Sequence, residues 1–203
     1  MESKINYPYF RAVAFSASSK QAPTANTDSE ELTYQIAQTV LDLAEELRTN
    51  VRFYSSLKQC TKLSEIYLTP SFWYAKQMLQ GSIPKVNSSW GTTALAMWCR
   101  CLPEVRAVST NNFISDLASA SKGDQPLVSE MRFRQLLCAP NEEIFLTQLI
   151  GCIRLINGEI NPSSLLDSIF LWCRDNCENA SIQLTDRQTA NYIWANEFYS
   201  KRS

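Results

Sequence analysis

Three features of the sequence predict an all-α fold. Apolar residues recur at spacings of three and four along most of the chain, as they do on one face of an α-helix. No segment keeps the strict alternation of apolar and polar residues that marks a half-buried β-strand. Glycine is scarce, at 5 of 203 residues, so the chain offers few of the tight turns that join β-strands. We therefore expect about eight or nine helices in two packed helical bundles.

The first helix is expected to begin at about residue 30. The segment before it, over 11–29, is rich in Ala, Ser and Thr and is typical of a flexible lead-in. Thr27-Asp28-Ser29 offers side-chain oxygens that can cap a helix, and Glu30-Glu31 suits the positive end of the helix dipole. Apolar residues then follow at helical spacing in one stripe: Leu32, Ile36, Val40, Leu43 and Leu47.

Further helices are expected at fairly even intervals along the rest of the chain. Pro70, Asn161-Pro162 and Thr185-Asp186 stand where helices are expected to begin. Prolines punctuate the loops between other helices: Pro84, Pro103, Pro126 and Pro140. The predicted helices cover residues 52–63, 71–80, 89–101, 112–120, 128–138, 142–157, 163–176 and 186–200. The predicted organisation is a flexible lead-in over 1–29, an N-terminal helical subdomain over 30–105 and a C-terminal helical subdomain over 106–203.

The charges are unevenly distributed, although the net charge is only −1. Residues 28–48 contain one basic and six acidic side chains, whereas residues 49–134 contain ten Lys or Arg against five Asp or Glu. A locally basic face can bind phosphates even on a neutral chain, because screening confines the interaction to about 8–10 Å. An ordinary solvated surface is the other interpretation of this pattern, and composition alone favours it.

Helical phasing places several arginines away from the predicted core. At 100° per residue, Arg154 lies about 180° from Phe145 in its helix, and Arg174 lies about 180° from Leu165. Four arginines thus fall at exposed or boundary positions of their helices: Arg132, Arg134, Arg154 and Arg174. A surface that follows a phosphate backbone needs such an arrangement, and so does a soluble protein.

The composition argues against most enzyme classes. The chain has no histidine, which removes the usual general base, the Ser-His and Cys-His nucleophile pairs and every His-containing zinc site. It also has no glycine-rich phosphate loop, and its adjacent carboxylates are better explained by helix dipoles than by acid-base chemistry. We expect no catalytic residue and no cofactor.

The cysteines indicate neither a metal site nor a framework of disulfide bonds. Cys99-x-Cys101 and Cys173-x3-Cys177 could supply four thiolates to zinc, but neither pair has the usual C-x2-C spacing. Seven cysteines cannot all pair, and the chain shows neither a signal segment nor an apolar run long enough to span a membrane. We therefore predict a cytoplasmic protein without a metal site. Most tryptophans fit core packing, although Tyr74 or Trp90 could stack on a nucleic-acid base.

A series of motifs in the second half resembles a known family. The motifs are Met131-Arg132-Phe133-Arg134-Gln135-Leu136-Leu137, the helix from Leu146 to Ile156, Asn161-Pro162-Ser163-Ser164-Leu165-Leu166, Leu171-Trp172 and Tyr192-x-Trp194-x3-Phe198-Tyr199. In the first half, Pro70-Ser71-Phe72-Trp73-Tyr74 and Trp90-x4-Leu95-Ala96 agree more loosely. In order and spacing these motifs resemble the small subunit of type I-E CRISPR Cascade, the CasB family, over about residues 50–200.

The resemblance implies a helical, non-catalytic subunit of an RNA-guided surveillance complex in antiviral defence. It implies contacts with the crRNA backbone subunits, the large subunit, a second copy of itself, and the backbones of crRNA and target DNA in the R-loop, with no membrane. Lys58, Arg132 and Arg174 match basic positions of the family, whereas Cys138 and Gly151 stand where the family has arginine. Arg134 and Arg154 lie close to these two positions and could substitute. The predicted nucleic-acid-binding residues are Lys58, Lys62, Arg132, Arg134, Arg154 and Arg174.

Two other classes of function remain open at this point. A helical protein-interaction adaptor without nucleic-acid binding would use the same basic residues only for solubility. A helical enzyme that relies on carboxylates or a thiolate is the least favoured, because histidine is absent and no acidic residues converge in the sequence. The extended N-terminus, up to about residue 45, departs from the family pattern and has no predicted role.

Overall fold

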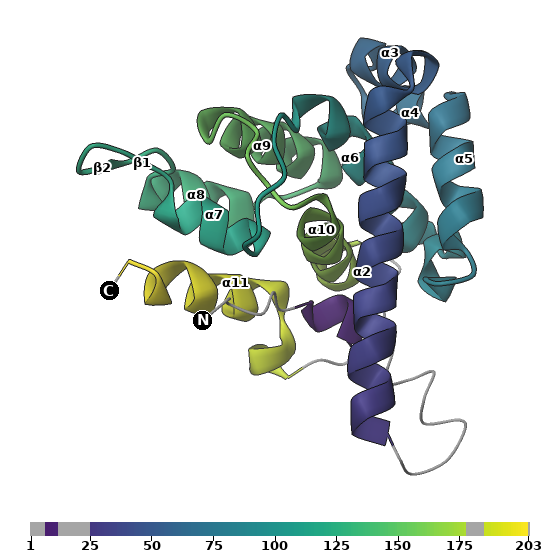
Figure 1. Cartoon of the computed structure of the whole chain (residues 1–203). Coiled ribbons are helices and arrows are strands. Elements are labelled where there is room, and N and C mark those ends of the chain that lie inside the picture. Colours follow the sequence, from purple (N-terminus) through teal and green to yellow (C-terminus); the bar gives the residue numbers. More distant parts are fainter. Residues whose placement is uncertain (1–6, 12–24, 178–184, 203) are drawn as a thin grey trace.

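The computed structural model describes residues 7–11, 25–177 and 185–202, and these are mostly helical (Figure 1). The helices are α2 (Ala25–Thr49), α3 (Val51–Gln59), α4 (Leu63–Ile66), α5 (Pro70–Leu79), α6 (Ser89–Cys101), α7 (Phe113–Ser119), α8 (Glu130–Leu137), α9 (Glu142–Leu155), α10 (Pro162–Asn176) and α11 (Ala190–Ser200). Short 3-10 helices are η1 (Pro84–Asn87), η2 (Leu102–Glu104) and η3 (Asp186–Gln188). The all-α prediction is confirmed. None of the described helices is long and apolar enough to cross a membrane.

Most predicted helix starts are confirmed, because capping residues set them. The side chain of Thr69 caps the N-terminus of α5, so Pro70 occupies the first turn, where its missing N–H costs nothing. Asn161 Oδ1 accepts the backbone N–H groups of Ser163 and Ser164 at 3.0 and 3.1 Å, and so fixes the start of α10. The first long helix begins earlier than expected, at Ala25 rather than near residue 30.

Two predicted helices are divided in the structure. The segment predicted as 52–63 breaks after Gln59, because Glu65 accepts the backbone N–H groups of Thr61 and Lys62 and begins a new helix, α4. The segment predicted as 186–200 breaks at Thr189, which is extended and caps α11. In both cases a local side-chain hydrogen bond offers the backbone an alternative to a continuous helix.

One small β-hairpin was not predicted. Strands β1 (Ser121–Lys122) and β2 (Gln125–Pro126) pair antiparallel and project at one edge of the molecule (Figure 1). Gly123 adopts a positive φ of 62° in the turn, which suits glycine. Each strand has only two residues, too few to show any period-two pattern.

The core is built around α10, which is seen nearly end-on at the centre of Figure 1. Every residue from Pro162 to Cys173 is buried, because α2, α6, α7 and α11 all pack against this helix. The rings of Phe145 and Trp172 stack with centroids 3.8 Å apart and so join α9 to α10. The rings of Phe133 and Phe198 stack at the same distance and join α8 to α11.

This core includes side chains from both predicted subdomains. α10 lies in the predicted C-terminal subdomain, yet it packs against α2 and α6 from the N-terminal one. Trp98 Nε1 in α6, for example, donates a hydrogen bond to the backbone carbonyl of Pro162 at 2.8 Å. The division at residue 105 into two bundles therefore remains a prediction.

A short N-terminal segment also belongs to the core. Tyr7, Tyr9 and Phe10 are buried. The backbone N–H groups of Tyr9 and Phe10 donate to the carboxylate of Asp167 in α10. These residues lie within the predicted flexible lead-in over 1–29, of which residues 1–6 and 12–24 are outside the described part of the chain. Burial of these aromatic side chains thus fixes residues 7–10 to the core, although the sequence predicted a flexible segment there.

Candidate nucleic-acid interface

Three long helices end beside η2, and each brings an arginine in its last turn. These are Arg48 of α2, Arg100 of α6 and Arg154 of α9. A cation in the last turn is favourable because the carbonyl end of a helix dipole is negative. The packing of these helix ends therefore gathers positive charge at one place.

Arg154 makes the closest charge contact at η2. Its Nη2 lies 2.6 Å from Oε1 of Glu104, and its Nε lies 2.9 Å from Oε2 of the same carboxylate. This two-point contact is the geometry that a guanidinium adopts with carboxylates and phosphates. The hydrogen bonds from Arg154 hold the pKa of Glu104 below its usual range. The Arg154 side chain is still 60% exposed, as helical phasing predicted, whereas that of Glu104 is 19% exposed.

Three more arginines surround this pair. Arg100 Nη1 lies 3.5 Å from Oε1 of Glu104, and Arg48 Nη2 donates to the backbone carbonyl of Arg106 at 3.4 Å. Arg106 is itself exposed, and its backbone N–H donates to the carbonyl of Gly158. We call Arg48, Arg100, Arg106 and Arg154 the η2 arginine cluster.

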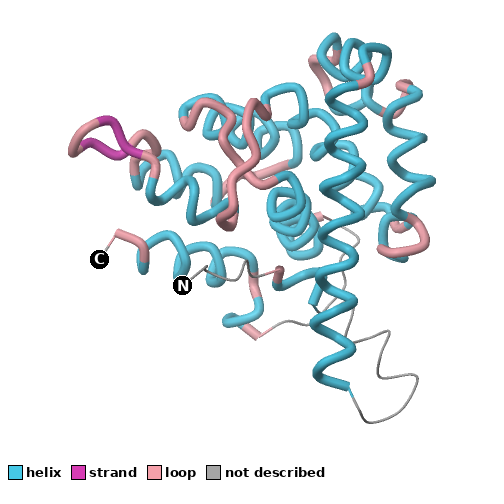
Figure 2. Tube along the Cα trace, in the orientation of Figure 1, coloured by secondary structure: helices cyan, strands magenta, loops and turns pink. Residues whose placement is uncertain are grey.

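Only one member of the η2 arginine cluster, Arg154, was predicted from the sequence. The other three come from α2, from α6 and from the loop after η2, and the packing of helix ends and loops brings them together. Two loops, pink in Figure 2, run side by side from η2 and from the end of α9, joined by a bridge between Ala107 and Glu159. The available sequence signal was a basic residue near the end of several predicted helices, and this does not reveal which ends meet.

Lys58 lies in the last turn of α3, and Lys62 is the N-cap residue of α4. Both are exposed, and the ammonium of Lys58 lies 5.5 Å from the ring centroid of Tyr54. Cys60 is buried between them. Burial raises the pKa of its thiol, and the charge of Arg100 opposes this shift. Helix α3 packs against η2 and α4 packs against α6, so the turn between α3 and α4 lies beside the elements that carry Arg100 and Glu104.

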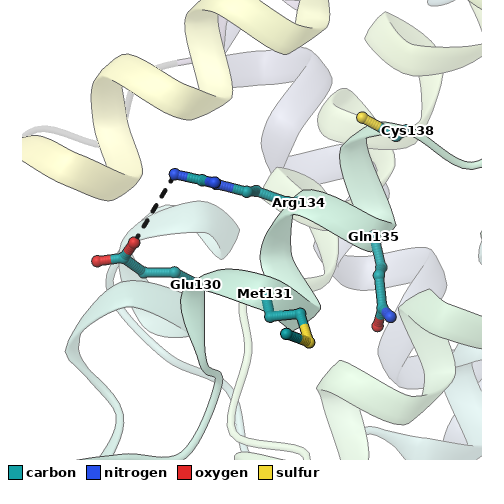
Figure 3. A pocket seen from close by; sticks show the side chains of 5 residues that line it. All are labelled: Glu130, Met131, Arg134, Gln135 and Cys138. Carbon is teal, nitrogen blue, oxygen red and sulfur yellow. Dashed lines mark ion pairs between the residues drawn. The ribbon is translucent and has the colours of Figure 1, made fainter.

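Arg132 and Arg134 lie on α8, and both are exposed as predicted. Arg134 Nε is 3.4 Å from the hydroxyl of Tyr199, and its Nη2 is 4.0 Å from the carboxylate of Glu130. Figure 3 shows Arg134 beside an open groove of about 500 Å³, which is lined by Glu130, Met131, Arg134, Gln135 and Cys138. Arg132 forms no ion pair with any residue that the structure describes, so it is available to a partner.

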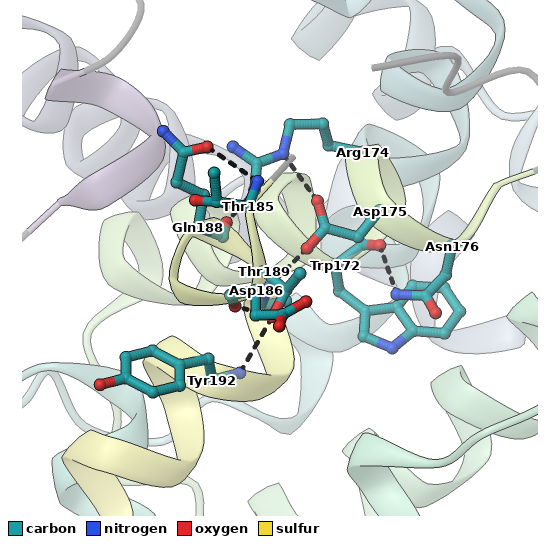
Figure 4. A network of polar contacts seen from close by, with 10 residues as sticks. Trp172, Arg174, Asp175, Asn176, Thr185, Asp186, Gln188, Thr189 and Tyr192 are labelled. Carbon is teal, nitrogen blue, oxygen red and sulfur yellow. Dashed lines mark hydrogen bonds and ion pairs between the residues drawn. The ribbon is translucent and has the colours of Figure 1, made fainter. Parts of the chain in front are cut away.

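Arg174 is in a different environment from the other predicted residues. Its side chain is only 13% exposed, its Nε lies 2.7 Å from Oδ1 of Asp175, and its Nη2 donates to the carbonyl of Gln188 at 2.6 Å. The second oxygen of Asp175 accepts the N–H of Ala190 at the start of α11 (Figure 4). Arg174 therefore lies at a boundary and ties α10 to α11. Phasing did not show this, because α10 is covered on all sides by other helices.

Neither aromatic candidate for base stacking presents a free ring. Tyr74 stacks on Phe53 with centroids 5.0 Å apart, and its hydroxyl donates to Glu46 at 2.8 Å. Trp90 is buried and packs edge-on against Tyr9 and Phe170. Core packing explains Trp90, and Tyr74 is partly buried against the edge of the core.

The cysteines are free thiols. Within the described ranges, no three His, Cys, Asp or Glu side chains come together where a metal ion could bind. Burial raises the pKa values of Cys99 and Cys101, the latter to about 12, which keeps these thiols protonated and unreactive near neutral pH. Only Cys138 is exposed among the seven.

The fold and this geometry define a helical protein with exposed cations on helix ends, on loops and on one face of α8. The family model of CRISPR-associated protein Cse2 matches residues 56–199, and the chain belongs to this family. Comparisons with curated proteins and with solved structures gave no match. The family consists of structural subunits of Cascade, the CRISPR surveillance complex, so the resemblance stated from the sequence is confirmed. All six predicted residues lie inside the matched range, whereas α2 and residues 7–11 precede it.

Proposed function

We propose that the protein is the non-catalytic small subunit of a type I-E Cascade and stabilises the R-loop by binding the nucleic-acid backbone. The observation that carries this proposal is the family match over residues 56–199, within which five predicted cations are exposed on helix ends, loops and one helix face. These five are Lys58, Lys62, Arg132, Arg134 and Arg154. Arg174 is not among the proposed phosphate-binding residues, because its guanidinium already contacts Asp175 and the carbonyl of Gln188. Its proposed role is to hold α11 against α10.

The proposed mechanism is a shift in a conformational equilibrium. Opening a DNA duplex against an RNA guide is nearly balanced, because the new heteroduplex is about as stable as the DNA pairing it replaces. A subunit that contacts phosphates only in the opened state shifts this balance by its differential affinity. A few modest contacts are enough inside a complex, where the local concentration of the strands is high. This mechanism needs no general acid, base or metal.

The proposed partners follow from membership of Cascade. They are the crRNA backbone subunits, the large subunit, a second copy of this chain, and the backbones of crRNA and target DNA. We place the protein in the cytoplasm, where such a complex meets invading DNA.

The test is the lifetime of the R-loop in a reconstituted complex with and without this subunit. The complex without it should retain crRNA but form R-loops that dissociate sooner, and added protein should restore their lifetime. A variant in which the five exposed cations are changed to Ala should assemble into the complex yet fail to restore the lifetime.

A matched variant controls for the loss of charge. Five exposed cations outside the proposed interface are changed to Ala instead: Arg11, Lys85, Lys122, Arg187 and Lys201. This variant should restore the lifetime nearly as well as the unmodified protein. Equal R-loop lifetimes with and without the subunit would contradict the proposal and favour the adaptor interpretation.

A further inference from the structure

Glu104 occupies one of the two edges of the Arg154 guanidinium that could bind a phosphate. A guanidinium offers two edges for such a two-point contact, Nε with Nη2 and Nη1 with Nη2. A phosphate that uses the first edge must displace a carboxylate bound there, and a phosphate on the second edge meets a cation whose charge the carboxylate already neutralises. In this structure both nitrogens of the first edge, Nε and Nη2, are taken by the two oxygens of Glu104, at 2.9 and 2.6 Å. Arg154 is therefore exposed to solvent but not free.

The two partners differ in how far they can move. The backbone of Glu104 is fixed against Gly158, because a Cβ atom at Gly158 would lie 2.1 Å from the carbonyl oxygen of Glu104. Gly158 has a positive φ of 69°, so the loop can approach this closely only with glycine there. Arg154, in contrast, lies in the last turn of α9 with 60% of its side chain exposed. When the pair separates, Arg154 is the partner that can turn away.

Glu104 would keep a cation if Arg154 left. Arg100 Nη1 lies 3.5 Å from Glu104 Oε1, and the Arg100 side chain is only 12% exposed. The buried carboxylate would not be left unpaired, which removes much of the cost of breaking a partly buried ion pair. The arrangement therefore allows Arg154 to exchange one anion for another.

We propose that Glu104 is an internal competitor for the phosphate site on Arg154, and that binding of a nucleic-acid phosphate transfers Glu104 to Arg100. The proposal rests on the proposed function, since it concerns how one cation of that interface is controlled. Glu104 would lower the affinity of the free subunit for nucleic acid, so that Arg154 engages only a phosphate that the complex holds close to it. Glu45 and Glu159 also lie near the cluster, and Glu45 pairs with Arg48 at 3.3 Å, not with Arg154.

The test is a double-mutant cycle on R-loop lifetime in the reconstituted complex, with four forms of the subunit: unmodified, Glu104→Gln, Arg154→Ala and the double variant. Glu104→Gln keeps the shape of the side chain but removes the competing charge. It should lengthen the lifetime by about fivefold, the size expected for release of an ion pair whose arginine is largely exposed. In the Arg154→Ala background the same change should alter the lifetime by less than about twofold, because the released cation is missing.

Two further variants complete the design. Glu31→Gln makes the same change of charge on the exposed face of α2, where Glu31 contacts only Gln35 in the described chain, and it should leave the lifetime unchanged. If Glu104→Gln does not fold, Glu104→Asp keeps the charge but is too short to reach both nitrogens, and it should lengthen the lifetime to a smaller extent. Thermal unfolding of each variant establishes that it is folded.

The outcomes separate this inference from the proposed function. If Arg154→Ala shortens the lifetime but Glu104→Gln does not lengthen it, the ion pair is only structural and the inference is overturned while the function stands. An equal gain from Glu104→Gln with and without Arg154 would also overturn it, because the effect would then be one of overall charge. If the complex without the subunit has the same R-loop lifetime as the complete complex, the proposed function itself fails.

Discussion

The carboxylate of Asp167 accepts the backbone N–H of Phe10 at 2.7 Å and so ties the N-terminal segment to the central helix. A second, longer bond comes from the N–H of Tyr9 at 3.3 Å, and the hydroxyl of Tyr7 lies 3.0 Å from that of Ser163. Burial raises the pKa of Asp167 to about 8, although the two backbone N–H groups oppose this shift. The folded protein therefore holds a proton there that the unfolded chain releases near pH 4.

This proton makes the stability of the protein depend on pH. The folded pKa of Asp167 is above the unfolded value, so its contribution is complete at low pH and is lost as the pH rises through about 8. Between pH 5 and 8 the free energy of unfolding should fall by up to about 1.4 kcal/mol per pH unit from this group. Asp167→Asn should remove this slope, which urea unfolding of both proteins at several pH values would measure. Parallel pH profiles would contradict the assignment.

The N-terminal segment should contribute strongly to stability. Phe10→Ala removes a fully buried ring and should destabilise the protein by about 3–5 kcal/mol. Arg11→Ala, at the exposed neighbouring position, should stay within about 0.5 kcal/mol of the unmodified protein. Chemical denaturation measures both changes, and a small effect of Phe10→Ala would show that the segment is not part of the folded core.

The phasing of α9 can be tested in the same way. Leu149 is fully buried, and Leu149→Ala should destabilise the protein by about 2–5 kcal/mol. Thr147→Ala, on the exposed side of the same helix, should change the stability by about 0.5 kcal/mol or less. Comparable losses from the two substitutions would mean that the helix faces the core differently.

Arg132 and Arg174 should respond differently to substitution. Arg174→Ala leaves Asp175 without its cation in a mostly buried network, so it should lower the free energy of unfolding by at least about 2 kcal/mol. Arg132→Ala should leave stability within about 0.5 kcal/mol, because its side chain is exposed. The result to look for is a loss of stability confined to Arg174→Ala.

Arg132 should instead affect binding, by an amount that does not depend on the target sequence. If it contacts a phosphate, Arg132→Ala should reduce the slope of log affinity against log salt by roughly 0.7–0.9 for R-loop binding by the complex. Arg187→Ala removes an equally exposed arginine on η3 and should leave the slope unchanged. An unchanged slope in the Arg132 variant would show that this arginine is only solvated.

The fold class was predictable because its signals are local. Helical spacing, the scarcity of glycine and the caps at Thr69 and Asn161 act over a few residues and survive in the structure. The hairpin and the break after Gln59 were missed, since they depend on two-residue strands and on one carboxylate, Glu65, that accepts backbone N–H groups.

The candidate site was predictable only in part. Family resemblance and phasing identified Arg132 and Arg154, because position on a single helix is encoded locally. The rest of the η2 arginine cluster, and the engagement of Arg154 by Glu104, depend on which helix ends meet. The low exposure of the Arg174 side chain likewise depends on the elements that pack around α10. The sequence of α10 alone does not specify them.

The central position of α10 also has a consequence for synthesis of the protein. Helices α2 to α9 leave the ribosome before the helix around which they pack, since α10 spans only residues 162–176. Until that segment emerges, the faces of α2 and α6 that pack against α10, which include Trp98, lack this cover, and the nascent chain displays apolar surface. Production of this subunit should therefore depend on chaperones that hold the growing chain until its last quarter has been translated.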